Sequence, residues 1–439
     1  MDTILPQYYR EYGKYINTFR SLPLNLDGLK PVERRVLLTS YLVANDKFVK
    51  SARIDGNCIA KFHPHGGVYG TTVQMVNQDF LEGQGIFGVS IGIEPMPPAA
   101  MRYTEVKLPE RTKELCFKYI KHVPWISGDL DDEPQYLPTK YPLCLLGNEY
   151  TQGIGFGYRT VIPCYTISDL QMRLLWLLGK LDKEPIIRPK SDCDILSDDN
   201  TIKELLTNGK AKIEVKGRSS SINIQCKTIL KSWPPGRRFE YLLSKFKKEL
   251  EAQDIGYIDS SNEDVGTEII FTVLKQRNRD KIFKSFIKKL DEVLKGSISF
   301  EIVTVDLNGD IKVSSVDEML LNTFKMFTEV NEKMLNYEIN KISDQIIELQ
   351  ALELIRDPLS KVISKVSSET DFNRENMGEK ISEIAQVSGI PEEVVKALIS
   401  KYRIQKLLTL NTDTSDLVEQ KKLIEEDLNN LNEYVLNQY

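Results

Sequence analysis

The stretch AAMRYTEVKL, residues 99–108, reads as a β-strand, and it follows three stretches that each predict a short helix. The first helix is expected within residues 26–43, where Pro31 takes an early helical position and its missing N–H costs nothing. The second and third are expected within residues 51–62 and 68–78. Three short helices with tight turns, followed by a strand, indicate a helix-turn-helix unit whose strand forms a wing.

Length and composition limit the class of protein. The 439 residues are too many for one hydrophobic core, so two to four domains are expected. No stretch approaches the ~18–20 apolar residues of a membrane span, and the N-terminus lacks the pattern of a signal peptide. Six scattered cysteines predict reduced thiols in a cytoplasm. The net charge of −5 argues against a protein whose whole surface binds a polyanion, but it does not exclude local basic patches.

The predicted fold class is a multidomain α+β protein, with the winged helix in residues 1–165 and an α/β domain in residues 166–320. Strand patterns in that second domain are AKIEVKG, SINIQCKTIL, TEIIFTVL and ISFEIVTVD. Two lysine-rich amphipathic stretches, 239–250 and 279–294, predict helices between them. Their basic faces fit either simple solvation or a contact with flanking DNA, and the sequence does not decide between the two.

Residues 321–439 are predicted to be helical, with two apolar seams of coiled-coil spacing. The seams comprise Leu335, Ile339, Ile342, Ile346 and Leu349, and then Leu417, Ile424, Leu428, Leu431 and Val435. They favour an antiparallel arm, about 325–355 and 405–439, with a small helical knob at about 356–404 that would suit a dimer contact. A plain structural rod is the alternative.

Several motifs point to chemistry that we do not expect here. Gly83, Gly85 and Gly88 match the dinucleotide pattern GxGxxG, but no long helix follows them. The acidic stretches 129–133 and 191–199 lack a spaced third ligand, so solvated loops are expected and no metal site is predicted in this chain. There is also no GxxxxGK[ST] loop for ATP phosphates.

The stretch KFHPHGG contains two of the three histidines, His63 and His65. Half of a metal site is a poor fit, because the third histidine and the cysteines do not lie at a matching spacing. The histidine pair of a rolling-circle nickase is also a poor fit, because the residue between its histidines should be a bulky apolar residue on a strand, and here it is proline. Phosphate contact fits better, since a turn that opens a helix attracts anions.

Arg102 and Tyr103 raise the possibility of a tyrosine nucleophile. A phenol with a pKa near ~10 is a weak nucleophile at neutral pH, so attack on a phosphodiester needs cationic groups for the charge that develops. Arg102 is such a group, provided that a loop or strand end lets two adjacent side chains reach the same phosphate. A metal ion would complete the site.

Taken in order, LPLNLDGLKPVERR, SARIDGNCIAKFHPHGG, LEGQGIFG and AAMRYTEVKL resemble the breakage–reunion (A-type) subunit of bacterial and phage type IIA DNA topoisomerases. The resemblance continues through LPTKYPLCLLGNEYTQGIGFGYRTVIP and the three-part layout. It implies a winged-helix DNA-gate domain, a tower domain for residues 166–320 and a coiled-coil arm with a dimerisation knob. The activity implied is ATP-dependent relaxation and decatenation of DNA.

The resemblance also implies roles for individual residues. Tyr103 would form a transient 5′-phosphotyrosyl bond with DNA, and Arg102 would stabilise its transition state. His63 and His65 would lie near the scissile phosphate. Ile162, before Pro163, would wedge between base pairs, which bends the duplex so that more protein contacts it. The cationic phosphate contacts would be Arg20, Lys30, Arg34 and Arg35.

Some positions depart from the family pattern. Glu33 stands where relatives often have histidine, and HPHGGVYG is shorter than the relatives' HPHGDSAVYD, which puts sensitivity to fluoroquinolones in doubt. The chain ends with the arm, so the DNA-wrapping domain of gyrase is not expected. The compact length suits a phage-encoded medium subunit.

The partners implied are double-stranded DNA, a second copy of this chain, and a B-type subunit that binds Mg²⁺ and ATP in an A2B2 assembly. Twofold symmetry suits the cutting of two antiparallel strands. Two other functions stay open: a rolling-circle-type tyrosine nickase, and a non-enzymatic coiled-coil DNA organiser. In the second, Arg102 and Tyr103 would be ordinary strand residues.

Overall fold

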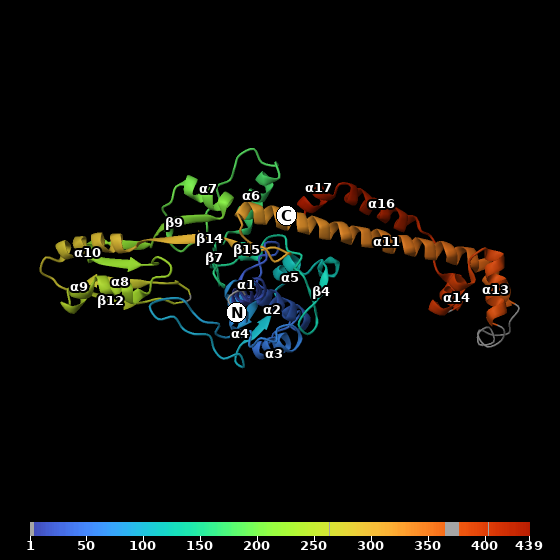
Figure 1. The fold of residues 1–439 in the computed structure, drawn as a ribbon, viewed down its shortest axis with the longest axis horizontal. Coiled ribbons are helices and arrows are strands. Elements are labelled where there is room, and N and C mark those ends of the chain that lie inside the picture. Colours follow the sequence, from blue (N-terminus) through green and yellow to red (C-terminus); the bar gives the residue numbers. More distant parts are fainter. Residues whose placement is uncertain (1–3, 263, 365–376, 403) are drawn as a thin grey trace. The chain divides into compact units, whose positions relative to one another are not determined.

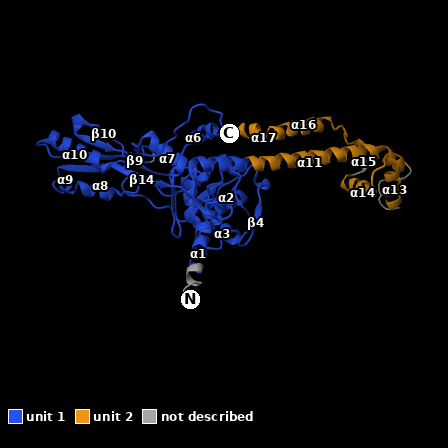
Figure 2. Ribbon diagram, turned by 45° about the horizontal axis from the view of Figure 1, so that its top comes forward, with its two compact units in different colours: residues 1–327 blue, residues 328–439 orange. Residues whose placement is uncertain are grey.

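The computed structural model describes residues 4–262, 264–364, 377–402 and 404–439, and it has a mixed α/β architecture. The chain divides into two compact units, Met1–Phe327 and Thr328–Tyr439 (Figure 2). The first unit holds all the strands of the described residues, while its last residues begin the long helix α11, Val316–Ser364, which continues into the second. Because this division falls at 327/328, the domain boundary predicted at 165/166 stays a prediction.

The three predicted N-terminal helices form as expected, and Figure 1 shows them grouped near the N-terminus. They are α2 (Pro31–Val43), α3 (Ser51–Lys61) and α4 (Tyr69–Asn77). In α2 the proline occupies the first turn, and the Glu33 side chain accepts a hydrogen bond from the Lys30 amide, which caps the helix start. An additional helix, α1 (Ile4–Ile16), precedes them and runs into a short π-helix, η1 (Asn17–Ser21).

The predicted strand at 99–108 is shorter than expected. Only Glu105–Lys107 forms a strand, β3, at the centre of a three-stranded antiparallel sheet. Its neighbours are β1 (Val49–Lys50) and β2 (Glu82–Gln84). Residues 101–103 form a turn before it. No helix follows the glycine pattern, since Gly85 and Gly88 have φ of +106° and +89°.

The rest of the first 165 residues consists of short elements. These are α5 (Glu110–Cys116), η2 (Ile120–His122), β4 (Trp125–Ser127), β5 (Asp132–Pro134), η3 (Leu143–Leu145), β6 (Thr151–Ile154) and β7 (Arg159–Ile162). Strands β4 and β5 form a hairpin, and so do β6 and β7.

The hairpin β6–β7 belongs to a five-stranded sheet of order β6-β7-β14-β9-β8. The other strands are β8 (Asp194–Ile195), β9 (Lys210–Lys216) and β14 (Lys295–Glu301). The helices α6 (Ile167–Leu177) and α7 (Asp199–Asn208) lie in the same part of the chain. A buried ion pair holds α6: Arg173 donates to Asp317 through Nε and Nη2, both at 2.7 Å.

A four-stranded sheet of order β10-β11-β13-β12 packs with three helices around a phenylalanine-rich core (Figure 1). Its strands are β10 (Ser219–Ile222), β11 (Lys227–Leu230), β12 (Ile255–Asp259) and β13 (Ile269–Val273). The helices are α8 (Phe239–Lys245), α9 (Lys247–Glu251) and α10 (Arg279–Val293).

Two strand predictions in this region were wrong in extent. SINIQCKTIL is not one strand: β10 and β11 are joined by a 3₁₀ turn, η4 (Asn223–Gln225), and by Cys226, whose φ is +48°. ISFEIVTVD supplies the end of β14 and then β15 (Val303–Val305), which pairs instead with β16 (Ile311–Val313). Alternation predicts strand residues but not where a tight turn ends one strand.

In the described residues of the second unit, the regular secondary structure is all helical. Helices α16 (Ser415–Asn429) and α17 (Leu431–Leu436) lie along α11 in both views (Figures 1 and 2), and Gln438 donates to Asn331 at 2.9 Å. Helices α13 (Met377–Ser388), α14 (Glu392–Lys401) and α15 (Ile404–Thr409) form an apolar cluster with the end of α11. Part of the predicted knob, residues 365–376, lies outside the described residues.

Two chain-wide properties complete the fold. The six cysteines are free and buried. Burial raises the pKa of the Cys58 and Cys164 thiols to about 11. In the part of the chain that the structure describes, no helix is long and apolar enough to cross a membrane.

Candidate active site

Tyr103 lies on the turn before β3, and it is 65% exposed. The guanidinium carbon of Arg102 is 4.6 Å from the centre of its ring. The sequence analysis required a loop or a strand end here, so that the side chains of Arg102 and Tyr103 could lie on the same side. The turn meets this requirement, because its backbone is not that of a strand.

Hydrogen bonds fix the turn on the N-terminus of α3. The Ser51 and Ala52 amides donate to the carbonyls of Thr104 and Met101, at 3.0 and 3.3 Å. The Thr104 hydroxyl donates to the Ser51 hydroxyl at 2.8 Å and lies 3.1 Å from that of Tyr69. Since Thr104 is fully buried, the residue next to the exposed tyrosine is held rigidly.

Gly85 packs closely against the backbone of the same turn. Its φ is +106°, and a Cβ there would lie 3.3 Å from the Tyr103 carbonyl oxygen. The glycine pattern rejected as a dinucleotide site thus lies beneath the turn that carries Tyr103.

A second group of polar residues surrounds the two histidines. Their rings are 5.3 Å apart, and the His65 Nε2 lies 3.6 Å from the Asp129 carboxylate. Arg35 contacts His63, with Nη1 at 3.2 Å from Nδ1. Burial, and next the charge of Arg35, lowers the pKa of His63 to about 4, so this imidazole is neutral at physiological pH.

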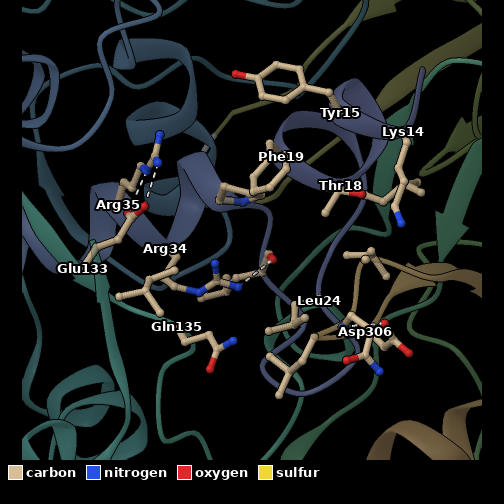
Figure 3. Close-up of a pocket in the computed structure, with 18 of the residues that line it drawn as sticks. Lys14, Tyr15, Thr18, Phe19, Leu24, Arg34, Arg35, Glu133, Gln135 and Asp306 are labelled. Atoms are coloured by element: carbon tan, nitrogen blue, oxygen red, sulfur yellow. Dashed lines mark hydrogen bonds and ion pairs between the residues drawn. The ribbon is translucent and has the colours of Figure 1, made fainter. Parts of the chain in front are cut away.

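The predicted phosphate contact of Arg35 needs correction. The residue is 7% exposed, and its Nε and Nη2 donate to the two Glu133 carboxylate oxygens at 2.8 and 2.7 Å (Figure 3). Asp129 accepts a further bond at 3.3 Å. The acidic stretch 129–133 is therefore not a free solvated loop, because two of its carboxylates bind this arginine.

Arg34 and Lys30 are also engaged within the protein, and their predicted phosphate contacts stay predictions. Arg34 donates to the fully buried Asp27 through Nε and Nη2, at 2.7 and 3.0 Å. The Lys30 ammonium donates to the Gln152 carbonyl at 2.6 Å and lies 3.7 Å from Glu33. These cations hold α2 and β6 in place.

A cavity of about 440 Å³ lies beside these arginines (Figure 3). Its lining combines Arg34, Arg35 and Glu133 with aromatic side chains of α1 and η1, Tyr15 and Phe19. The arginine–carboxylate pair thus forms a wall between the cavity and His63.

Arg20, on η1, is the predicted phosphate contact that remains exposed, and no partner of its guanidinium is seen among the described residues. Its charge contributes to the lowered pKa of His63, so it lies close to the histidines. Sequence reasoning missed two further exposed cations of α3, Arg53 and Lys61. Each is four residues from Asn57, and this helical spacing of polar residues on one face was the available signal.

The wedge assigned to Ile162 also needs correction. Ile162 is fully buried in β7, so it cannot enter a DNA stack without unfolding its strand. Ile154, in the same hairpin, is 80% exposed, and Phe156 beyond it is 47% exposed. Added Cβ atoms at the neighbouring Gly153 and Gly155 would come within 2.4 Å of η1, so the hairpin backbone lies against that helix. An isoleucine between two glycines was the signal in the sequence.

Comparisons with known proteins agree on one family. The family model that describes the A subunit of DNA gyrase/topoisomerase IV matches residues 20–439. The chain is 28% identical over 443 residues to the DNA gyrase A subunit of Brachyspira hyodysenteriae, covering 93% of this chain and 52% of that protein. It is 27% identical over 452 residues to the DNA topoisomerase 4 A subunit of Staphylococcus aureus, covering 97% and 54%.

The chain belongs to the gyrase/topoisomerase IV A-subunit family. It spans about half the length of the curated relatives that it matches.

In this member of the A-subunit family, one chain does not bring all the predicted site residues together. The Tyr103 turn caps the N-terminus of α3, whereas His63 follows its C-terminus, where the His63 amide donates to the Cys58 carbonyl. Eleven helical residues span about 16 Å along the axis. Among the described residues, no hydrogen bond or ring contact joins Tyr103 or Arg102 to either histidine.

The described residues include no group of three or more His, Cys, Asp or Glu side chains that could hold a metal ion. The described side chains around Tyr103 do not fit a Mg²⁺ site on their own.

Proposed function

We propose that this chain is the DNA cleavage–religation subunit of an ATP-dependent type IIA topoisomerase, with Tyr103 as the nucleophile. The observation that carries the proposal is the exposed Tyr103 beside Arg102 on a turn fixed by α3, in a chain of the A-subunit family. It would relax and decatenate DNA in the cytoplasm through a transient double-strand break.

The chemistry is a reversible transesterification. The Tyr103 phenol oxygen attacks the scissile phosphorus, the bond from phosphorus to the 3′ oxygen breaks, and the DNA 5′ phosphate becomes bound to tyrosine. The phenol loses its proton and the leaving 3′ oxygen gains one. Arg102 stabilises the charge on the phosphoryl oxygens, and its position over the ring lets it reach them without unfolding the turn. Religation reverses each step.

A homodimer would complete the site. Because α3 separates Tyr103 from the histidines within one chain, Tyr103 of one copy would meet His63 and His65 of the other across a twofold axis. Arg20, with Arg53 and Lys61, would supply the phosphate contacts, and Ile154 would replace Ile162 as the wedge.

The finer architecture of the resemblance belongs to the same proposal. Helices α2–α4 and the sheet β1-β3-β2 would form the winged-helix DNA gate, residues 166–320 the tower, and the second unit the arm and dimerisation knob. A B-type partner would bring Mg²⁺ and ATP in an A2B2 assembly, and Mg²⁺ would stabilise the charge on the scissile phosphate.

The test uses end-labelled linear DNA, this chain, Mg²⁺ and a candidate B-type subunit, stopped with detergent. We expect protein-linked 5′ ends on both strands for the natural chain and none for Tyr103→Phe, because the phenylalanine lacks the attacking oxygen. Tyr241→Phe is the control, since Tyr241 is also exposed but lies on α8.

Adducts on one strand only would favour a nickase. Adducts that persist in Tyr103→Phe would rule out this nucleophile, and DNA binding without any adduct would favour a DNA organiser.

A further inference from the structure

Arg35 connects a carboxylate on one side to a histidine on the other. Two of its nitrogens donate to Glu133, at 2.8 and 2.7 Å, and the third, Nη1, lies 3.2 Å from the His63 Nδ1. Glu133 belongs to β5, Arg35 to α2, and His63 follows α3. Three separate elements thus meet through one guanidinium.

The direction of the last hydrogen bond is decided by chemistry. A guanidinium can only donate, so the Nδ1 of His63 must be the acceptor and carries no proton. The single proton of the neutral ring is therefore on Nε2. A doubly protonated ring could not accept this bond, and a ring with its proton on Nδ1 would oppose it.

The surroundings favour the same state. His63 is half-buried, and the charged or titratable groups that face it are Arg35 of α2, Arg20 of η1, His65 and Asp129. Burial lowers its pKa most, the charges of Arg35, His65 and Arg20 lower it further, and Asp129 raises it by less.

We propose that Glu133 is a positioning residue for DNA cleavage: by holding Arg35, it keeps His63 neutral with its proton on Nε2, so that His63 donates a hydrogen bond to the scissile phosphate or the leaving 3′ oxygen. That a DNA phosphate or 3′ oxygen accepts this hydrogen bond rests on the proposed function. The tautomer of His63 is independent of that function, because it follows from the contacts of this chain alone.

Glu133 carries this role better than the other nearby carboxylate. Its two oxygens bind two nitrogens of the guanidinium, which fixes the plane as well as the position of Arg35. Asp129 makes one longer bond, 3.3 Å, and its side chain is 43% exposed. Without Glu133, Arg35 would be a buried cation lacking its main partner, so it would turn toward water and leave Nδ1.

The test reads the imidazoles directly by ¹⁵N NMR of histidine-labelled full-length chain. The chain has three histidines, so His→Gln variants assign each signal. We expect the natural chain to show His63 protonated on Nε2 only, with no titration between pH 5 and 8. In Glu133→Ala we expect both tautomers and a titration midpoint shifted from about 4 toward ~6.5.

Asp132→Asn is the matched control, because Asp132 is exposed on the same strand. An unchanged His63 spectrum in Glu133→Ala would overturn the proposal. If Glu133→Ala does not fold, the double variant Arg35→Met/Glu133→Gln removes both charges together, and it should release His63 in the same way.

Cleavage with the partner subunit gives the second readout. We expect Glu133→Ala to lower the cleavage rate by up to about 100-fold and to move the acidic limb of its pH profile upward, as the NMR midpoint moves. A released His63 with an unchanged rate and pH profile would overturn the positioning role. Absence of cleavage by the natural chain would count against the proposed function, while the NMR result would still decide the tautomer.

Discussion

At the scale of single residues, exposure separates groups that can meet DNA from groups that hold the fold. Tyr103, Arg102 and Arg20 are exposed, whereas Arg34 and Arg35 are bound to buried or half-buried carboxylates. The sequence marks all four arginines as candidates because an arginine looks the same whether it faces solvent or a carboxylate. Only the folded chain reveals that Asp27, seven residues before Arg34, and Glu133, 98 residues after Arg35, are their partners.

The two isoleucines of the β6–β7 hairpin allow a direct comparison. We expect Ile154→Ala to reduce the bend of a bound duplex while leaving stability within about 0.5 kcal/mol, because its exposed side chain packs against little. Ile162→Ala should lower the free energy of unfolding by about 2–5 kcal/mol and leave the bend unchanged. Energy transfer between dyes at the two duplex ends measures the bend, and urea unfolding measures the stability. A bend lost only in Ile162→Ala would restore the original assignment.

At the scale of elements, the start of α2 depends on Asp27. Its carboxylate accepts two bonds from Arg34 and also accepts bonds from the amides of Leu29 and Leu137, both at 3.0 Å. One buried side chain therefore joins the turn before α2 to a segment more than a hundred residues later.

We expect Asp27→Ala to lower the free energy of unfolding by about 3–5 kcal/mol, since it removes the buried carboxylate partner of the half-buried Arg34 and leaves the Leu29 and Leu137 amides without their acceptor. Urea unfolding measures this. Asp46→Ala is the control, because the Asp46 side chain is 87% exposed and should change stability by less than about 0.5 kcal/mol. Equal effects of the two changes would contradict the role given to Asp27.

Helices were easier to predict than strands and turns. The position of Pro31 and the apolar period predicted α2 within residues 26–43, and the first apolar seam predicted a helix at about 325–355 that α11 extends at both ends, over Val316–Ser364. The wing strand and SINIQCKTIL failed in extent because alternation continues through Tyr103 and Cys226, although the backbone turns there. The site was predicted residue by residue through the resemblance, whereas the ion pair of Arg35 with Glu133 depends on strand β5, whose position beside α2 no local pattern reveals.

At the scale of the whole molecule, the second unit has a hydrophobic core of its own. We expect Leu352→Ala, at a site 1% exposed, to reduce amide protection within residues 328–439 and to leave residues 1–327 protected. Hydrogen exchange with mass spectrometry measures this region by region. Leu354→Ala, at a site 55% exposed, is the matched control. Protection lost throughout the chain would mean that the two units unfold together.

The buried thiols have a practical consequence for studying motion. Because all six cysteines are covered and two have thiols with a pKa of about 11, maleimide reagents at neutral pH should leave the folded chain almost unmodified. A cysteine introduced at an exposed position, such as Leu354 or Ile224, would then be the one reactive thiol in each copy. In the proposed homodimer, such labels would report the distance between the two copies, without first removing any natural cysteine.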